Sequence, residues 1–328
     1  MDLAGLQEAV FKVDEQHFDF LAMEIFKFQS ENCPVYKRFL NYLQIDMSKI
    51  MHIDDIPYLP IGFFKDQEIK SGDFTAEIIF ESSSTTGTGV SRHHVKDLNV
   101  YTESFTRSFN CFFDDYQSYC HLALLPSYLE RQHSSLVFQV DYFIRHSVYE
   151  QSSFFLHNAD ELYAILMENE KQQIPTILWG VTYALLDFID RFKLKLKHTI
   201  IIETGGMKGK RKEITRMELH ELLRNGLSVK DIGGEYGMTE LMSQAYAVRA
   251  GLYQCPPWMR VSGREINDPL GRPVFERHAA INIIDLANLH SCSFIATSDL
   301  GKVYRDKSFE ILGRIDYSDT RGCNLLID

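Results

Sequence analysis

Short apolar segments alternate with longer amphipathic segments through the middle of the chain. The short segments predict strands over Glu77–Glu81, His121–Leu125, Thr176–Leu178, Thr199–Glu203, Ser228–Gly233 and Ile281–Asp285. The amphipathic segments predict helices over Asp97–Asp114, Ala159–Glu170, Val181–Arg191 and Lys212–Asn225. Strands and helices in alternation are typical of an α/β domain with a mostly parallel sheet, which is the fold class that we expect.

The N-terminal part departs from this alternation. Apolar residues recur at helical spacing over Leu3–Phe28, which predicts one helix there. Cys33 ends the pattern, because the residue before a proline is pushed out of the helical region. A second short helix is predicted over Tyr36–Leu43, and Asp54–Pro60 is predicted to be a loop.

After Gly251 the pattern becomes one of short strands and turns. We therefore expect residues 1–250 to form an α/β lobe with N-terminal helices. Residues 251–328 would form a smaller β-rich subdomain, which ends in a short tail carrying Cys323.

Composition limits the classes of partner. The chain has 328 residues, with 34 Lys and Arg against 45 Asp and Glu, for a formal net charge of −11. No overall positive field would drive binding to a nucleic acid, so no nucleic-acid partner is expected. The longest apolar stretch, Ile174–Ile189, is short and interrupted by Pro175 and Asp187, so no membrane span is predicted. The N-terminus shows no secretory signal pattern, so a soluble cytoplasmic protein is expected.

The cysteines and histidines indicate no structural metal site. The chain has 6 cysteines and 12 histidines, without a Cys-x-x-Cys pair or a His/Cys cluster at zinc spacing. Free thiols are therefore expected. A metal ion that arrives with a nucleotide remains compatible with this pattern.

The segment from Ser82 to Arg92 is the most unusual in the chain. It is dominated by hydroxyl and glycine residues, follows a predicted strand and ends on a cation. Hydroxyls and unshielded backbone N–H groups favour anion binding, and glycine lets the chain approach phosphate oxygens closely. The candidate phosphate-binding residues are Ser83, Ser84, Thr85, Thr86, Gly87, Thr88, Gly89 and Arg92. The spacing is that of neither a Walker A loop nor a dinucleotide fingerprint. The alternative is a flexible Ser/Thr linker.

Two further glycine-containing segments follow predicted strands. Glu203–Lys210 contains Gly205 and Gly206 at a strand end, where open α/β sheets bind ligands. Its alternative is an ordinary turn with a solvated basic run.

The other segment is Gly233–Glu240. Tyr236, followed by Gly237, could stack on a base, Thr239 could bind a phosphate, and Glu240 could hold Mg²⁺. The alternative is a helix N-terminus with Thr239 as its cap.

In this order, the segments resemble motifs of the adenylate-forming superfamily of acyl-CoA synthetases, luciferases and related ligases. Ser83–Arg92 is similar to its phosphate loop, and Tyr236–Glu240 matches its Tyr-Gly-x-Thr-Glu motif in full. Thr297–Gly301 looks like its Thr-Gly-Asp-Leu segment, and Gly313–Asp316 looks like its Gly-Arg-x-Asp hinge.

The resemblance implies a fold and a set of roles. The fold would be the superfamily's N-terminal lobe with a smaller β-rich subdomain, lacking most of the C-terminal cap domain. The cofactors would be ATP and Mg²⁺. Asp299 would bind the ribose hydroxyls, Arg314 would lie near the ribose and α-phosphate, and Gly205 and Gly206 would line an adenine slot beside Tyr236.

Within the superfamily, the chain is most similar to LuxE-type acyl-protein synthetases. Glu203–Gly209 and the C-terminal Arg321–Cys323 carry this likeness. It implies that a carboxylic acid, in this family a fatty acid, is adenylated and then moved to a cysteine near the C-terminus. By position that cysteine is Cys323, from which the acyl group would pass to a partner acyl reductase. A thiolate readily attacks an acyl-phosphate anhydride, so the chemistry suits this residue type.

The chain also departs from the family pattern. Arg92 replaces the usual lysine, which keeps the charge but changes its geometry. The chain ends soon after the hinge motif, so no lysine of a C-terminal domain can be assigned. Alternative functions are an acyl- or aryl-CoA ligase resembling phenylacetate-CoA ligases, and a non-catalytic subunit that binds a nucleotide or an acyl group.

Overall fold

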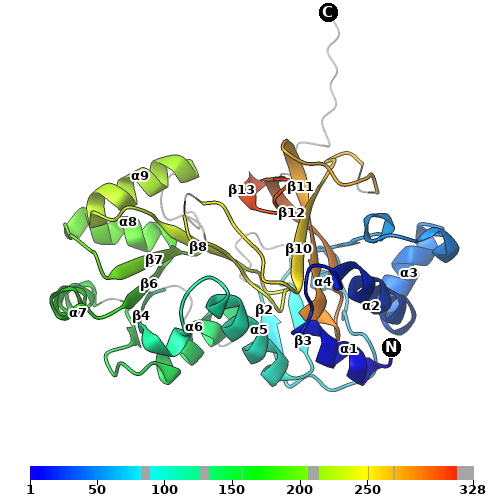
Figure 1. Cartoon of the computed structure of the whole chain (residues 1–328), viewed down its shortest axis with the longest axis horizontal. Helices are drawn as coiled ribbons and strands as arrows, with labels where there is room; N and C mark the ends of the chain where they lie inside the picture. Colours follow the sequence, from blue (N-terminus) through cyan, green and yellow to red (C-terminus); the bar gives the residue numbers. More distant parts are fainter. Residues whose placement is uncertain are drawn as a thin grey trace, which may run out of the picture.

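A six-stranded sheet forms the centre of the larger part of the molecule (Figure 1). Its strand order is β5-β4-β6-β7-β8-β9, and all neighbouring pairs from β5 to β8 are parallel, whereas β9 is antiparallel. The strands are β4 (Cys120–Leu124), β5 (Ser153–Phe154), β6 (Thr176–Gly180), β7 (Thr199–Glu203), β8 (Gly233–Tyr236) and β9 (Ala245–Ala247). The expected α/β class with a mostly parallel sheet is confirmed. The computed structural model describes residues 1–82, 89–125, 133–156, 158–205, 214–249, 251–268 and 270–315.

Helices cover both faces of this sheet. Figure 1 shows α8 and α9 on one face and α5 and α6 on the other. The helices of this part are α5 (Leu98–Asn110), α6 (Ser135–His146), α7 (Ala159–Gln172), α8 (Thr182–Arg191) and α9 (Arg216–Leu227). Between the sheet and α5–α6 lies an aromatic core in which Phe109, Phe143 and Trp179 contact one another. Large aromatic side chains supply much of the buried apolar area of such a core.

Helix α6 was not predicted. Its buried face contains Ser135 and Gln139 beside Val140 and Phe143. Polar residues on the buried face interrupt the apolar spacing by which an amphipathic helix is recognised. Those polar residues lie beside the cavity described below.

A second sheet and a hairpin complete the structure. The second sheet has the order β1-β12-β11-β10, with β13 also paired to β12. Its strands are β1 (Leu59–Pro60), β10 (Met259–Arg264), β11 (His278–Asp285), β12 (Phe294–Val303) and β13 (Phe309–Arg314). The hairpin consists of β2 (Ile78–Glu81) and β3 (Arg92–Val95). The hydroxyl-rich segment therefore follows one antiparallel strand and precedes another, instead of leading directly into a helix.

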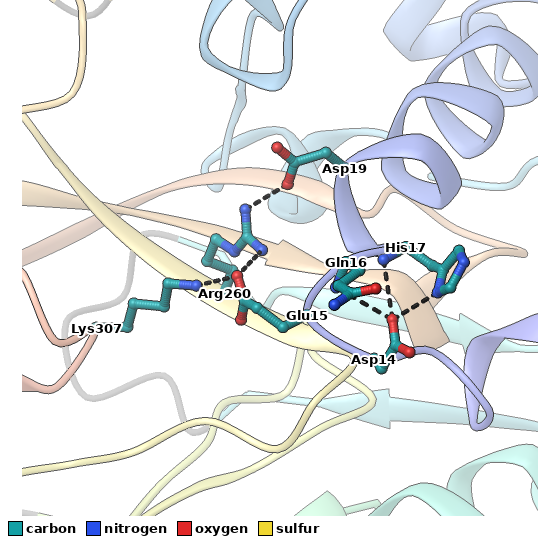
Figure 2. Close-up of polar contacts among 7 residues, drawn as sticks. All are labelled: Asp14, Glu15, Gln16, His17, Asp19, Arg260 and Lys307. Atoms are coloured by element: carbon teal, nitrogen blue, oxygen red, sulfur yellow. Dashed lines mark hydrogen bonds and ion pairs between the residues drawn. The ribbon is translucent and has the colours of Figure 1, made fainter.

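The predicted N-terminal helix is two helices. The N-terminal helices are α1 (Leu3–Val10), α2 (Phe18–Asn32), α3 (Pro34–Tyr42) and α4 (Phe63–Asp66). Between α1 and α2, the carboxylate of Asp14 accepts hydrogen bonds from the backbone N–H groups of Gln16 and His17 at 3.1 and 3.0 Å (Figure 2). An Asp side chain that binds nearby backbone N–H groups competes with the helical hydrogen bonds, so one continuous helix is excluded.

Two other expectations needed correction. The strand predicted over Ser228–Gly233 begins only at Gly233, because Ser228 has a φ of 53° at the end of α9 and pairing with β7 starts at Gly233. Asp54–Pro60 is not simply a loop, since Ile53–Asp55 forms a 3-10 turn and β1 pairs in parallel with β12. Further 3-10 turns are Met47–Lys49, Tyr116–Ser118 and Leu286–Asn288.

The N-terminal helices pack against the second sheet. The buried amide of Gln29 on α2 donates to the carbonyls of Asn288 and Leu289 at 3.1 and 3.0 Å, and its oxygen accepts from the N–H of Ser293 at 2.9 Å. The division at residue 250 stays a prediction, but the N-terminal residues share a core with strands from the C-terminal end. No helix among the described ranges has the length and apolar character of a membrane span.

Ion pairs reinforce this contact at the surface. Arg260 on β10 binds Asp19 at 2.6 Å and Glu15 at 3.2 Å, and Lys307 also binds Glu15 (Figure 2). The guanidinium of Arg260 lies over the ring of Phe18, with 3.9 Å between them. We call Glu15, Asp19, Arg260 and Lys307 the surface ion-pair network.

Candidate functional site

A cavity of about 720 Å³ opens beyond the carboxyl ends of β7 and β8, beside the β2–β3 hairpin and β12–β13. Ligands of open α/β sheets bind at this edge, and the volume suits a small-molecule ligand. Residues that the sequence singled out and that line the cavity are Gly89, Gly205, Tyr236, Gly237, Thr239, Glu240, Asp299 and Arg314. The fold thus brings together parts of the four motifs that resemble the adenylate-forming superfamily, together with Gly205.

Tyr236 and Arg314 position Asp299 in the cavity wall. The Tyr236 hydroxyl donates to Oδ2 of Asp299 at 2.7 Å, and Nε of Arg314 lies 3.4 Å from Oδ1. Asp299 and Arg314 stand opposite each other in the β12–β13 register. Burial raises the pKa of the Asp299 carboxyl, and the hydrogen bond from Tyr236 and the charge of Arg314 act against this rise. The Arg314 side chain is itself exposed.

The Thr239–Glu240 segment is a turn and not the start of a helix. Its backbone is held from outside the motif: the Thr239 carbonyl faces Nδ1 of His93 at 2.8 Å, and the Glu240 carbonyl accepts from the amide of Asn288 at 2.8 Å. Burial raises the pKa of the Glu240 carboxyl, and a hydrogen bond from Ser91 lowers it. The segment is therefore fixed while its carboxyl group lines the cavity.

His93 links the hydroxyl-rich segment to this turn. It lies on β3, directly after Ser91 and Arg92, and its Nε2 lies 3.0 Å from Oδ1 of Asn288. Burial lowers the pKa of His93 to about 4, and its contacts with Thr239 and Asn288 act against this shift. Sequence reasoning missed this residue, because a histidine within a short strand carries no signal of its own.

The cations are arranged differently from the expectation. Arg92 begins β3, interacts with Glu81 at 3.4 Å and does not line the cavity. Lys65 on α4 does line it, near Gly89, and makes no ion pair with a described residue. Of the remaining predicted site residues, Ser83, Ser84, Thr85, Thr86, Gly87, Thr88, Gly206 and Cys323 lie outside the described residues.

A carboxyl group on β7 and an arginine on α9 also line the cavity and were not predicted as site residues. Glu203 is buried, with 4% of its surface exposed, and accepts a hydrogen bond from the hydroxyl of Thr182. Burial raises the pKa of Glu203, while the charge of Arg216 and the Thr182 hydrogen bond lower it. Arg216 in turn donates to the Tyr253 hydroxyl at 2.6 Å. Gly205, with a φ of 78°, makes the turn after β7 in a conformation that favours glycine.

Glu235 on β8 is the second unpredicted carboxyl group. Thr204 donates to its Oε2 at 2.8 Å. Burial raises the pKa of Glu235 to about 7; the Thr204 hydrogen bond lowers it and the charge of Glu203 adds to the rise. Its place directly before Tyr236 was visible in the sequence, but its half-buried position in the cavity wall was not.

No group of three or more potential metal ligands occurs among the residues that the structure describes. Glu240 is one of several carboxyl groups that line the cavity. Mg²⁺ is often bound by one or two carboxylates together with the phosphates of a nucleotide, so a single carboxylate fits a metal that arrives with ATP. The described cysteines are free: Cys33, Cys120 and Cys292 are buried, Cys255 is half-buried and Cys111 is exposed.

Comparisons with solved structures identify the fold. No protein-family model and no curated protein matches the sequence. The 2-hydroxyisobutyryl-CoA ligase structure with 2-HIB-AMP and CoA superposes with a TM-score of 0.65 at 9% identity, over 94% of this chain and 78% of the ligase. ATP-bound MatB from Rhodopseudomonas palustris gives 0.53 at 14% identity, over 74% of this chain and 49% of MatB. The luciferase-like enzyme of the Zophobas morio mealworm gives 0.50 at 14% identity, over 75% and 60% of the two chains.

The chain spans about half the length of MatB. At these identities the likeness establishes the fold alone. That fold is the one found in the adenylate-forming enzymes, as the sequence motifs predicted.

Proposed function

We propose that this protein activates a carboxylic acid with ATP and forms an acyl-adenylate. The observation that carries the proposal is the cavity lined jointly by Gly89, Gly205, Tyr236–Glu240, Asp299 and Arg314. These residues come from segments far apart in sequence, and each segment matches a motif of the adenylate-forming enzymes in order. The ATP bound in MatB and the acyl-adenylate bound in 2-hydroxyisobutyryl-CoA ligase support the same reading.

The polar groups of the cavity suit the parts of ATP. Asp299, oriented by Tyr236, would accept hydrogen bonds from the ribose hydroxyls. Arg314 would lie beside the α-phosphate, and Gly205 would leave room for the adenine next to Tyr236. Lys65 and the Ser83–Gly89 segment would bind the other phosphates.

In the adenylation step, a carboxylate oxygen of the substrate attacks the α-phosphorus. The bond from that phosphorus to the bridging oxygen breaks, and pyrophosphate leaves with the electron pair. The substrate is already ionised, so no protein base is required. Catalysis would come from positioning and from charge stabilisation by Arg314 and the phosphate-binding segment.

Glu240 is the residue that we expect to hold Mg²⁺. Burial disfavours its ionised form, so a nearby cation would stabilise the carboxylate. Mg²⁺ would neutralise negative charge on the phosphates as the pyrophosphate departs.

The finer part of the proposal concerns Cys323. Its thiolate attacks the acyl carbon of the adenylate, the carbon–oxygen bond to AMP breaks, and AMP leaves with the electron pair; the thiol proton goes to solvent. The resulting thioester would deliver the acyl group to a partner acyl reductase. This part rests on the resemblance to LuxE-type acyl-protein synthetases.

Exchange of labelled pyrophosphate into ATP, dependent on an added acid and Mg²⁺, tests the first step. Arg314→Ala should reduce this exchange by roughly 100-fold, the loss usual for a group that stabilises developing charge. Arg145→Ala is the matched control, because Arg145 is equally exposed and also paired, with Asp141 at 2.8 Å on the surface of α6. Absence of exchange across fatty, aromatic and hydroxylated acids would contradict the proposal. ATP binding without exchange would favour a non-catalytic nucleotide-binding subunit.

Covalent labelling with a radioactive acid tests the second step. Cys323→Ser should keep the exchange and lose the labelled protein. Labelling that survives this substitution would refute the role of Cys323. Rapid formation of free acyl-CoA on addition of CoA would favour the alternative of a CoA ligase.

A further inference from the structure

One region of the cavity is lined by polar side chains that the adenylation step does not use. We call it the Glu235 subsite, and it consists of Glu235, Gln139, Gln244, Ser135 and Tyr101. Glu235 lies on β8, Gln139 and Ser135 on α6, Tyr101 on α5, and Gln244 directly before β9. Only the tertiary structure brings these elements together.

Contacts show that these residues are neighbours. A Cβ added at Gly237 would collide with Oε1 of Glu235 and would lie 3.2 Å from Cγ of Gln244. The charge of Glu235 helps to raise the pKa of Tyr101, whose hydroxyl donates to the carbonyl of Ser135 at 3.1 Å. The subsite is thus a compact group of polar atoms around Glu235.

Glu235 has spare capacity to accept a hydrogen bond. Its Oε2 accepts from Thr204, whereas no described residue donates a hydrogen bond to Oε1. No described cation forms an ion pair with this carboxyl group. Lys65 and Arg314 also line the cavity, but Arg314 pairs with Asp299.

The two glutamines extend this polar lining. Gln244 is 4% exposed, and its Oε1 has no hydrogen-bond partner in the described part of the chain. Gln139 is 1% exposed, and its amide donates to the Tyr246 hydroxyl at 2.8 Å. An alkyl chain bound here would leave Oε1 of Gln244 and Oε1 of Glu235 without a hydrogen-bond donor among the described residues, which is costly for polar atoms removed from water.

We propose that the Glu235 subsite binds a hydrogen-bond donor on the substrate, so that the acid activated here is a hydroxy- or amino-substituted carboxylic acid and not an unsubstituted fatty acid. The proposal rests on the proposed function and deepens it. It also departs from the fatty-acid substrate that the LuxE resemblance implies. Glu235 accepts the donor and is the residue that sets this specificity.

Matched acids in the pyrophosphate-exchange assay test the proposal. Each set holds an alkanoate and its hydroxy and amino derivatives of the same length, with the substituent moved along the chain, and tetradecanoate represents the fatty acids. A substituted acid should exceed its alkanoate in kcat/KM by about 100-fold or more, since a site built to hydrogen-bond a substrate strongly rejects an analogue without that group. The hydroxy and amino derivatives distinguish a neutral donor from an ammonium group.

Variants of Glu235 assign the preference to this residue. Glu235→Leu should reduce the preference to within a few-fold. Glu235→Gln keeps an acceptor, so it should retain most of the preference for a hydroxy acid and lose about 10-fold for an amino acid, because the charge is gone. Glu221→Leu, on the exposed surface of α9, is the matched control and should change nothing. If Glu235→Leu does not fold, Glu235→Ala, which also removes the acceptor, takes its place with the same expected loss of the preference.

Several outcomes would overturn the proposal. A tetradecanoate kcat/KM above that of every substituted acid would do so, as would an unchanged preference in both Glu235 variants; either result leaves acid activation itself intact. Calorimetric measurement of the binding of the same acids distinguishes a failure of the subsite proposal from a failure of the proposed acid activation. Binding of a substituted acid that depends on Glu235, without any exchange, would support the subsite and refute the proposed function. If the acids show neither exchange nor binding, both the subsite proposal and the proposed function are refuted.

Discussion

Glu203 and Glu235 lie near the carboxyl ends of neighbouring parallel strands, and they differ in how the fold compensates their charge. Each carboxyl group lines the cavity, accepts a hydrogen bond from a threonine and has a pKa raised by burial. The charge of Arg216 acts on Glu203 and lowers its pKa, whereas Glu203 itself raises that of Glu235 further. One carboxylate is therefore compensated within the fold, and the other is left to find a partner in the cavity.

The difference separates a structural role from a binding role. A buried charge that the protein itself compensates mainly stabilises the fold. A buried group without such compensation lowers stability, and this is typical of functional sites. The comparison can be tested by substituting, in turn, the cation, the uncompensated carboxyl group and the threonine hydroxyls.

Removing Arg216, the cation that compensates Glu203, should change the free energy of unfolding most. Arg216→Met leaves Glu203 buried without a nearby positive charge, so the free energy of unfolding should fall by about 2–3 kcal/mol at pH 8. Without Arg216 the pKa of Glu203 rises further, so the loss should be small near pH 5 and grow as pH rises. Urea unfolding at both pH values measures it. Arg224→Met, an exposed arginine on the same helix, is the control, and equal losses in the two variants would refute the compensation.

Neutralising Glu235, the uncompensated carboxyl group, should raise the free energy of unfolding instead of lowering it. The folded-state pKa of Glu235 is raised from 4.5 to about 7, so the folded protein binds more protons between these values and loses stability as pH rises through this window. Glu235→Gln should remove that loss and raise the free energy of unfolding by about 1–3 kcal/mol at pH 8, with little change near pH 4.5. Parallel pH dependences of the variant and the original protein would contradict the assignment.

Removing the threonine hydroxyls should have a smaller effect. Thr204→Val and Thr182→Val each remove one hydrogen bond to a carboxyl group in the cavity wall, and each should lower the free energy of unfolding by about 1 kcal/mol at pH 8. The Thr204 bond lowers the pKa of Glu235, so Thr204→Val should also move its titration to higher pH. Carbon NMR of the glutamate carboxyl groups measures this shift. A Glu235 titration that does not move would contradict the role of Thr204.

The surface ion-pair network should contribute least, although its direct contacts are short. Arg260→Met removes the pairs with Glu15 and Asp19, and the free energy of unfolding should change by less than about 1 kcal/mol, because solvent and salt screen exposed charges. Unfolding at low and high salt measures it. A larger, salt-independent loss would show that the packing of Arg260 on Phe18 matters more than its charge.

Sequence reasoning located most strands of the central sheet and most of its helices but missed the short strands β5 and β9 and helix α6. Strand β7 (Thr199–Glu203) was predicted with its observed bounds, because its apolar run is continuous. Helix α6 was missed, because Gln139 and Ser135 face inward. The single helix predicted over Leu3–Phe28 was wrong, because Asp14 binds local backbone N–H groups.

The site was predicted in the same uneven way. Ordered motifs singled out Tyr236, Glu240, Asp299 and Arg314, and the structure places all four at one cavity. Glu235 lies directly before Tyr236 but was not singled out. The reason is that its chemistry depends on burial and on the absence of a nearby cation.

The sequence by itself determined the α/β class, the order of the motifs and several of the residues that line the cavity, because periodicity and motif spacing are local properties of the chain. Only the tertiary structure decided that His93 and Asn288 hold the Thr239–Glu240 turn and that α2 packs on the second sheet. It also decided that Arg216 serves Glu203 and not Glu235. Desolvation and charge compensation depend on distances between residues remote in sequence, so no local pattern encodes them.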